Sequence, residues 1–87
     1  MMWSELRGTW GYKSGSSGSP TLPLGAQIIG IWAQGTSGTI AINGGDTLTF
    51  ATEFSIRFPH LLVVAKTTTP VAFGSTTAYL IEYVAPS

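Results

Sequence analysis

The chain has 87 residues, no cysteine and a formal net charge of zero, with four basic and four acidic side chains. This length is enough for one small domain, and the lack of thiols excludes disulfides and thiolate metal sites as reinforcement. The charge balance argues against nucleic acid and anionic membranes as partners, because both are bound by an excess of basic side chains.

The low total charge is more informative than its balance. Charged residues are 9% of the chain and apolar residues 44%, against roughly 25% charged residues in ordinary soluble domains. A free monomer with so few charges tends to associate, so we expect other protein to cover part of its surface. No apolar run reaches the roughly 18 residues of a membrane span. The first residues also lack the basic start and apolar stretch of a secretory signal, so we expect no membrane partner.

Residues 1–23 are predicted to form an extended N-terminal arm and a linker. Residues 1–13 show no sustained strand or helix period, and residues 14–23 are rich in glycine and serine and then in proline, a composition typical of flexible connectors. Tryptophan and tyrosine are common anchors of protein interfaces. We therefore predict that the arm binds a partner through four apolar side chains, Trp3, Leu6, Trp10 and Tyr12.

Residues 24–87 are predicted to form an all-β domain, an antiparallel β-sandwich or jelly-roll-like fold. Seven apolar segments are separated by turn signals, and no segment has a convincing helical period. The predicted strands are residues 26–33, 38–43, 47–51, 53–58, 61–66 and 77–84, with a short edge strand at 71–73.

The segment TIAINGGDTLTF, residues 39–50, predicts a β-hairpin. Its apolar residues share one face only if Ile42 lies opposite Leu48 and Ile40 opposite Phe50, which leaves residues 44–46 as the loop. A glycine pair can also hold a phosphate, but such loops precede a helix and a threonine-rich strand follows here. We therefore interpret the glycines as a structural turn.

The strands at 61–66 and 77–84 are apolar on both faces, whereas the strand at 53–58 alternates cleanly. Strands with two apolar faces need cover on both sides. Because no helices are expected, we expect the N-terminal segment or a second copy of the chain to cover them.

Catalytic and metal-binding residues are scarce. His60 is the only histidine and follows a proline in an expected turn, and no motif connects it with a nucleophile. One histidine and four scattered carboxylates give no metal-ligand spacing. We therefore predict no enzymatic activity, no cofactor and no metal.

Glu82 is the most informative charge, because it lies between Leu80 and Val84 on one face of a strand that is apolar on both sides. A covered carboxylate needs a cation, which could be Arg7, Arg57 or Lys66. We favour an interface ion pair of Glu82 with Arg57 over an active-site acid.

Aromatic residues leave a second class of function open. Trp32 and a tyrosine lying side by side on an exposed face would form a sugar-stacking platform, as in carbohydrate-binding β-sandwich modules. Two of the three tryptophans precede the predicted linker, however, where no rigid platform is expected.

Residues 25–84 resemble small all-β virion proteins of tailed bacteriophages, particularly capsid decoration or cement proteins. Three stretches carry the resemblance: AQIIGIWAQGTSGTIAINGGDTLTF, the apolar EFSIRFPHLLVVAK and the closing FGSTTAYLIEYV. The resemblance is a pattern of strands and small-residue turns, without a diagnostic motif.

The resemblance implies a structural protein of the virion, assembled in the host cytoplasm. Such proteins stabilise capsid subunit junctions, commonly as trimers. The expected partners are therefore the major capsid protein or other virion proteins and further copies of the chain. A neck, tail or fibre component remains an alternative within the same class.

Overall fold

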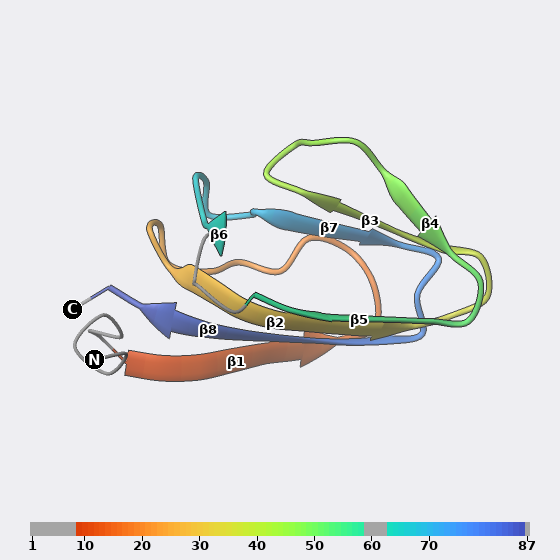
Figure 1. Cartoon of the computed structure of the whole chain (residues 1–87), viewed down its shortest axis with the longest axis horizontal. Helices are drawn as coiled ribbons and strands as arrows, with labels where there is room; N and C mark the ends of the chain where they lie inside the picture. Colours follow the sequence, from red (N-terminus) through yellow and green to blue (C-terminus); the bar gives the residue numbers. More distant parts are fainter. Residues whose placement is uncertain (1–8, 59–62, 87) are drawn as a thin grey trace.

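Two antiparallel β-sheets packed face to face make up the structure, a computed structural model that describes residues 9–58 and 63–86 (Figure 1). The predicted all-β sandwich is confirmed. Its strands are β1 (Thr9–Gly15), β2 (Gln27–Gln34), β3 (Gly38–Ile42), β4 (Leu48–Phe50), β5 (Glu53–Arg57), β6 (Val63–Val64), β7 (Val71–Gly74) and β8 (Ala78–Ala85).

The larger sheet has the order β1-β8-β2-β5, and β6 pairs with β2 along the same edge as β5. The smaller sheet has the order β4-β3-β7 and lies over the larger one (Figure 1). Seven of these eight strands fall inside or within one residue of the predicted segments. The strand that the sequence did not predict is β1.

The core lies between the two sheets and is built from the inward-facing side chains of both. Ile28, Ile31 and Ile81 come from the larger sheet and are fully buried. Phe73 of β7 stacks on Tyr79 of β8 with ring centroids 4.4 Å apart, so this aromatic pair joins one sheet to the other.

The predicted extended arm is wrong for residues 9–15, because they form the edge strand β1. Its register on β8 runs without interruption from the pair of Thr9 with Ala85 to the pair of Gly15 with Tyr79. A Cβ atom on Gly15 would lie 2.7 Å from the hydroxyl oxygen of Tyr79, so the glycine allows this ring to reach across the edge strand. Trp3 and Leu6 lie outside the described residues.

The predicted flexible linker is also wrong, because residues 16–26 run antiparallel beside residues 65–73 and close one side of the sandwich. Backbone N–H groups donate from Gly18 to Phe73 O at 3.0 Å, from Leu22 to Thr68 O at 2.8 Å and from Gly25 to Ala65 O at 2.9 Å. The Leu22 side chain is buried in the core, and the hydroxyl of the buried Thr76 donates to the Ser16 carbonyl. The boundary predicted at residue 23 therefore does not separate an arm from a domain.

The predicted hairpin exists, but its register was wrong by two residues. Ile40 lies opposite Leu48, and Gly38 lies opposite Phe50. Asn43 and Gly44 both have positive φ, and the Gly45 N–H donates to the Ile42 carbonyl, as in a type I′ turn. The loop after this turn leaves the ladder, so residues 45–47 do not pair.

The side chain of Asn43 explains why the turn starts there. Its amide nitrogen donates to the Val64 carbonyl at 2.9 Å, and its amide oxygen accepts from the Lys66 N–H at 3.2 Å. The Asn43 N–H also donates to the Pro70 carbonyl at 2.6 Å. Three bonds to β6 and the segment after it therefore hold this residue in its left-handed conformation, which asparagine tolerates better than most residues.

Candidate functional site

The outer face of the larger sheet, the side turned away from the smaller sheet, carries most of the candidate functional residues. Residues directly opposite each other in an antiparallel ladder point to the same side. The registers therefore place on this face Trp10 and Tyr12 of β1, Leu80 and Glu82 of β8, Gly30 and Trp32 of β2, and Glu53, Ser55 and Arg57 of β5.

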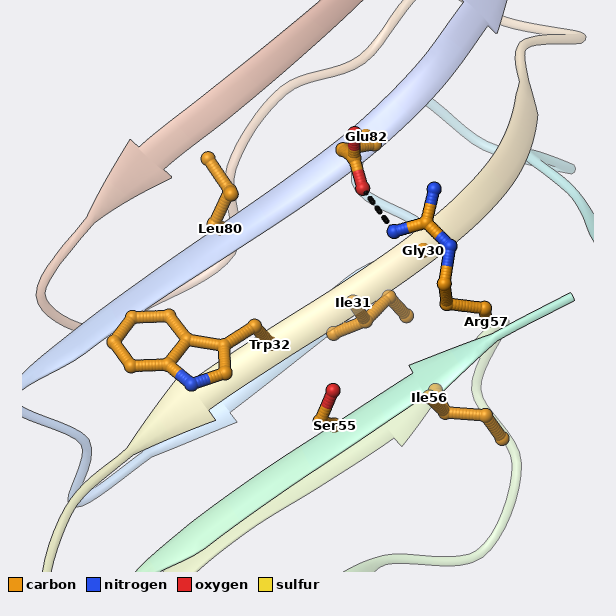
Figure 2. Close-up of a pocket in the computed structure, with 8 residues that line it drawn as sticks. All are labelled: Gly30, Ile31, Trp32, Ser55, Ile56, Arg57, Leu80 and Glu82. Carbon is orange, nitrogen blue, oxygen red and sulfur yellow. Dashed lines mark hydrogen bonds and ion pairs between the residues drawn. The ribbon is translucent and has the colours of Figure 1, made fainter.

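A shallow hollow of about 70 Å³ lies on the outer face over Gly30 (Figure 2). Glu82 and Arg57 flank Gly30 in the ladder, and their side chains meet above it. A Cβ atom on Gly30 would lie 3.1 Å from Glu82 Oε1 and 3.4 Å from Arg57 Nη1. The missing side chain therefore makes room for the charged pair and for the hollow beside it.

The charged pair itself is formed within the chain. Arg57 Nη1 donates to Glu82 Oε1 at 2.7 Å, and the two side chains are 69% and 24% exposed. Such an exposed pair contributes about 0–1 kcal/mol to stability. The sequence correctly indicated these two residues as an ion pair, and its place in an interface stays a prediction.

Trp32 lines the other side of the hollow and is held in place by a carboxylate. Its indole Nε1–H donates to Glu53 Oε2 at 2.7 Å, and these residues belong to the paired strands β2 and β5. This contact was not predicted. The alternation of residues 53–58 placed Glu53 outward, but only the register of β5 on β2 shows that it reaches the indole.

Trp10 and Tyr12 form an aromatic pair at the β1 edge of the outer face. Their ring centroids are 6.2 Å apart with a tilt of 49°. They are 56% and 58% exposed although they lie on an ordered strand. The sequence indicated both as anchors, but it placed them on an arm rather than on a sheet.

The aromatic residues of the outer face are not all adjacent. Tyr12 lies opposite Glu82, and Trp32 lies opposite Leu80, so β8 separates the tyrosine from Trp32. The side-by-side platform of Trp32 and a tyrosine is therefore not formed by Tyr12. Trp32 instead shares its hollow with the Arg57–Glu82 pair.

A second, more open hollow of about 330 Å³ lies where the chain passes between the sheets. Its lining has no ionisable side chain and consists of Gln34, Gly35, Thr36, Thr52 and Thr77. Backbone bonds from Gly35 to Thr52 O and from Thr77 to Gln34 O join the turns around it. This hollow offers hydroxyl groups and carbonyl oxygens, but no acid or base.

The described part of the chain contains no group of three or more side chains placed to hold a metal ion. His60 lies outside the described residues, as does Arg7, and Lys66 is exposed near Asn43. No helix in the described ranges has the length and apolar character needed to cross a membrane.

Comparison of the chain with protein-family models, with curated proteins and with solved structures finds no match.

Proposed function

We propose that this chain is a non-enzymatic structural protein of a bacteriophage particle, a capsid decoration or cement protein that attaches through Trp10 and Tyr12. The observation that carries the proposal is this exposed aromatic pair on an edge strand of a nearly uncharged domain. Aromatic side chains dominate the binding energy of many protein interfaces. The strand and turn pattern shared with small virion proteins supplies the assignment to a phage particle.

The mechanism differs from arm docking because the anchors are already ordered. An arm that orders on binding loses about 1–2 kcal/mol of backbone entropy per residue. The anchors on β1 avoid that cost, since the strand is paired with β8 along its whole length. Trp10 and Tyr12 therefore act as a rigid patch, which favours binding through preorganisation.

The size of the effect follows from the exposed area. A tryptophan or tyrosine buries about 150–250 Å² when fully covered, so covering the exposed half of each ring removes about 100 Å² from water. At about 25 cal/mol per Å² this is about 2.5 kcal/mol for each ring. Many copies on a symmetric lattice multiply this binding through avidity.

The partners proposed for this patch are the major capsid protein and further copies of the chain, with a trimer favoured. The free side of β1 suits such contacts, since none of the described strands pairs with it. A neck, tail or fibre position is the alternative within this class. Density for the chain on purified particles separates these positions directly.

The experiment compares the wild-type protein with a Trp10→Ala/Tyr12→Ala variant in rebinding to capsids stripped of accessory proteins. We expect the double variant to keep its far-ultraviolet circular dichroism and to lose on the order of 1,000-fold in affinity, because the two rings together account for about 5 kcal/mol and about 1.4 kcal/mol corresponds to tenfold. Leu48→Ala is the matched control, since Leu48 is also half-exposed and apolar but lies on β4 of the other sheet.

Equal loss of binding in the double variant and the Leu48→Ala control would show that general surface apolarity, not the aromatic pair, causes attachment. Unchanged binding of the folded double variant would remove Trp10 and Tyr12 from the mechanism. No binding of the wild-type protein to any stripped particle would overturn the virion assignment.

A further inference from the structure

We infer that the hollow over Gly30 is a saccharide-binding site, in which one sugar ring stacks on Trp32 and its hydroxyl groups bind the Arg57–Glu82 pair. This function goes beyond attachment to a particle and uses different residues of the outer face. The site brings together an immobilised aromatic ring, a charged pair of opposite signs and a floor without a side chain.

The stacking surface is Trp32. Figure 2 shows its indole face-on, on the same side of the sheet as Arg57, Leu80 and Glu82. The bond from Nε1 to Glu53 fixes the orientation of the ring before any ligand arrives. An aromatic ring is electron-rich on its face, so it attracts the polarised C–H groups of a sugar.

The hydrogen-bonding groups lie at a suitable distance from the ring. Gly30 and Trp32 are two residues apart on β2, and at about 3.3 Å per residue the charged pair lies about 7 Å along the strand, roughly the width of one pyranose with its hydroxyls. A sugar stacked on Trp32 therefore presents its hydroxyl edge to Glu82 and Arg57.

The charged pair has hydrogen-bonding capacity left for a ligand. Within the described residues Arg57 makes one side-chain bond, to Glu82 Oε1. A guanidinium has five N–H donors and a carboxylate has two acceptor oxygens. Of two neighbouring hydroxyl groups on the sugar, one can thus donate to Glu82 while the other accepts from Arg57. Such charge-assisted bonds are stronger than neutral ones.

The same features argue against other ligands. An anion would be repelled by Glu82 and a cation by Arg57, so the closely paired charges favour a neutral polyhydroxyl compound. Pockets that enclose drug-sized ligands have volumes of about 300–1,000 Å³, whereas this hollow has about 70 Å³. It can support one face of a sugar ring but cannot enclose a larger apolar molecule.

The test is a binding screen of the full chain against neutral oligosaccharides that contain glucose, galactose, mannose or N-acetylglucosamine. Hits are titrated while tryptophan fluorescence is recorded, and affinities are then measured by calorimetry. We expect at least one hit with Kd in the micromolar to low millimolar range. We also expect Trp32→Ala to weaken it at least tenfold and Glu82→Gln to weaken it several-fold.

Trp10→Ala is the matched control, because it removes an exposed tryptophan from the same face without touching the hollow. We expect it to leave saccharide affinity unchanged. If Trp32→Ala does not fold, Glu82→Gln and Gly30→Ala serve instead, since the added methyl group would lie against Glu82 and Arg57.

No binding across the panel would overturn the saccharide site, as would binding that Trp32→Ala and Glu82→Gln leave intact. Neither result touches the proposed attachment to a virion, which depends on Trp10 and Tyr12. Conversely, a folded double variant at those two positions that still binds capsids would leave the saccharide site standing.

Discussion

Replacing Leu22 by alanine tests the least expected feature of the fold, the packing of the glycine- and serine-rich segment into the core. Leu22 is 1% exposed and belongs to the buried cluster between the sheets. Buried Leu→Ala substitutions cost about 2.7–5 kcal/mol, through lost transfer energy and the cavity left behind. A domain of this size has about 4–13 kcal/mol of stability at 0.05–0.15 kcal/mol per residue, so the loss is a large fraction.

Leu24→Ala is the matched control, because it makes the same chemical change two residues further along at a side chain that is 60% exposed. Surface substitutions of this kind change stability by about 0.5 kcal/mol or less. In urea unfolding followed by circular dichroism, a slope of about 1 kcal/mol per M converts the Leu22→Ala loss into a fall of about 3 M in the midpoint. Leu22→Val, which keeps most of the volume, provides a measurable intermediate if Leu22→Ala is unfolded.

Midpoints that agree for the Leu22 and Leu24 variants would refute the reasoning, since they would mean that neither side chain is packed. The linker would then be a flexible connector, as its composition indicates, and the closure of the sandwich by residues 16–26 would be wrong.

Gly38→Ala is expected to lose about 1–3 kcal/mol of unfolding free energy, because the added methyl group would overlap the ring of Phe50. A thermal melt with an unchanged midpoint would contradict this packing. Asn43→Asp removes the amide donor to the Val64 carbonyl and puts an oxygen in its place, so we expect a loss of about 1 kcal/mol or more in urea unfolding. Wild-type stability in that variant would show that the turn does not depend on this bond. Glu82→Gln is expected to change unfolding free energy by about 1 kcal/mol or less, since its arginine partner is largely exposed; a loss several times larger would mean that the pair lies in a covered environment.

The strands from residue 26 onward could be predicted because their side chains carry the signal themselves. β2 and β8 are apolar along most of their length, and the sequence of β5 alternates between polar and apolar side chains, although Ile56 is 39% exposed in the structure. Each is bounded by glycine, proline, serine or threonine. Hydrophobic pattern and turn chemistry therefore agree over this region, which is the condition under which a sequence predicts its strands well.

β1 could not be predicted because its inward positions carry no apolar side chain. Gly11 and Gly15 face the core side, and the rings of Tyr83 and Tyr79 from β8 occupy the space above them. The apolar side chains that cover the inner face of β1 thus belong to β8 and not to β1 itself. A search for alternating apolar and polar side chains therefore finds no signal in this segment, whatever length of sequence window is used.

The hairpin register failed for a related reason. Aligning the apolar residues assumed that Ile42 needs a partner on β4, whereas Ile42 pairs with Val71 of β7. The dipeptide Asn43–Gly44 is itself a strong signal for a type I′ turn, but a two-residue loop there would place Ile40 opposite Thr47, one residue away from its observed partner Leu48. The long-range bonds that hold Asn43 could not have been inferred from neighbouring residues.

In the candidate site, too, one contact could be inferred from the sequence, whereas others depend on the pairing of distant strands. The Arg57–Glu82 pair could be inferred, because a carboxylate on an apolar strand demands a cation and few cations exist in this chain. The Trp32–Glu53 contact and the hollow over Gly30 depend on which strands are neighbours and in which register. That information is present only after the larger sheet has been assembled.

The fold changes how the low charge of the chain is interpreted, because it shows how much of the apolar surface the chain buries itself. We expected its apolar surface to exceed what one small sandwich can hide, so that an arm or a second copy would have to cover it. Residues 16–26 instead close one side of the sandwich and bury Leu22, while β1 pairs along the free edge of β8. The two largest rings left exposed among the described residues, Trp10 and Tyr12, lie together at one edge of one sheet. The binding surface that we propose is thereby narrowed to one aromatic patch, and because that patch lies outside the core, the proposal can be tested by mutation without removing the fold.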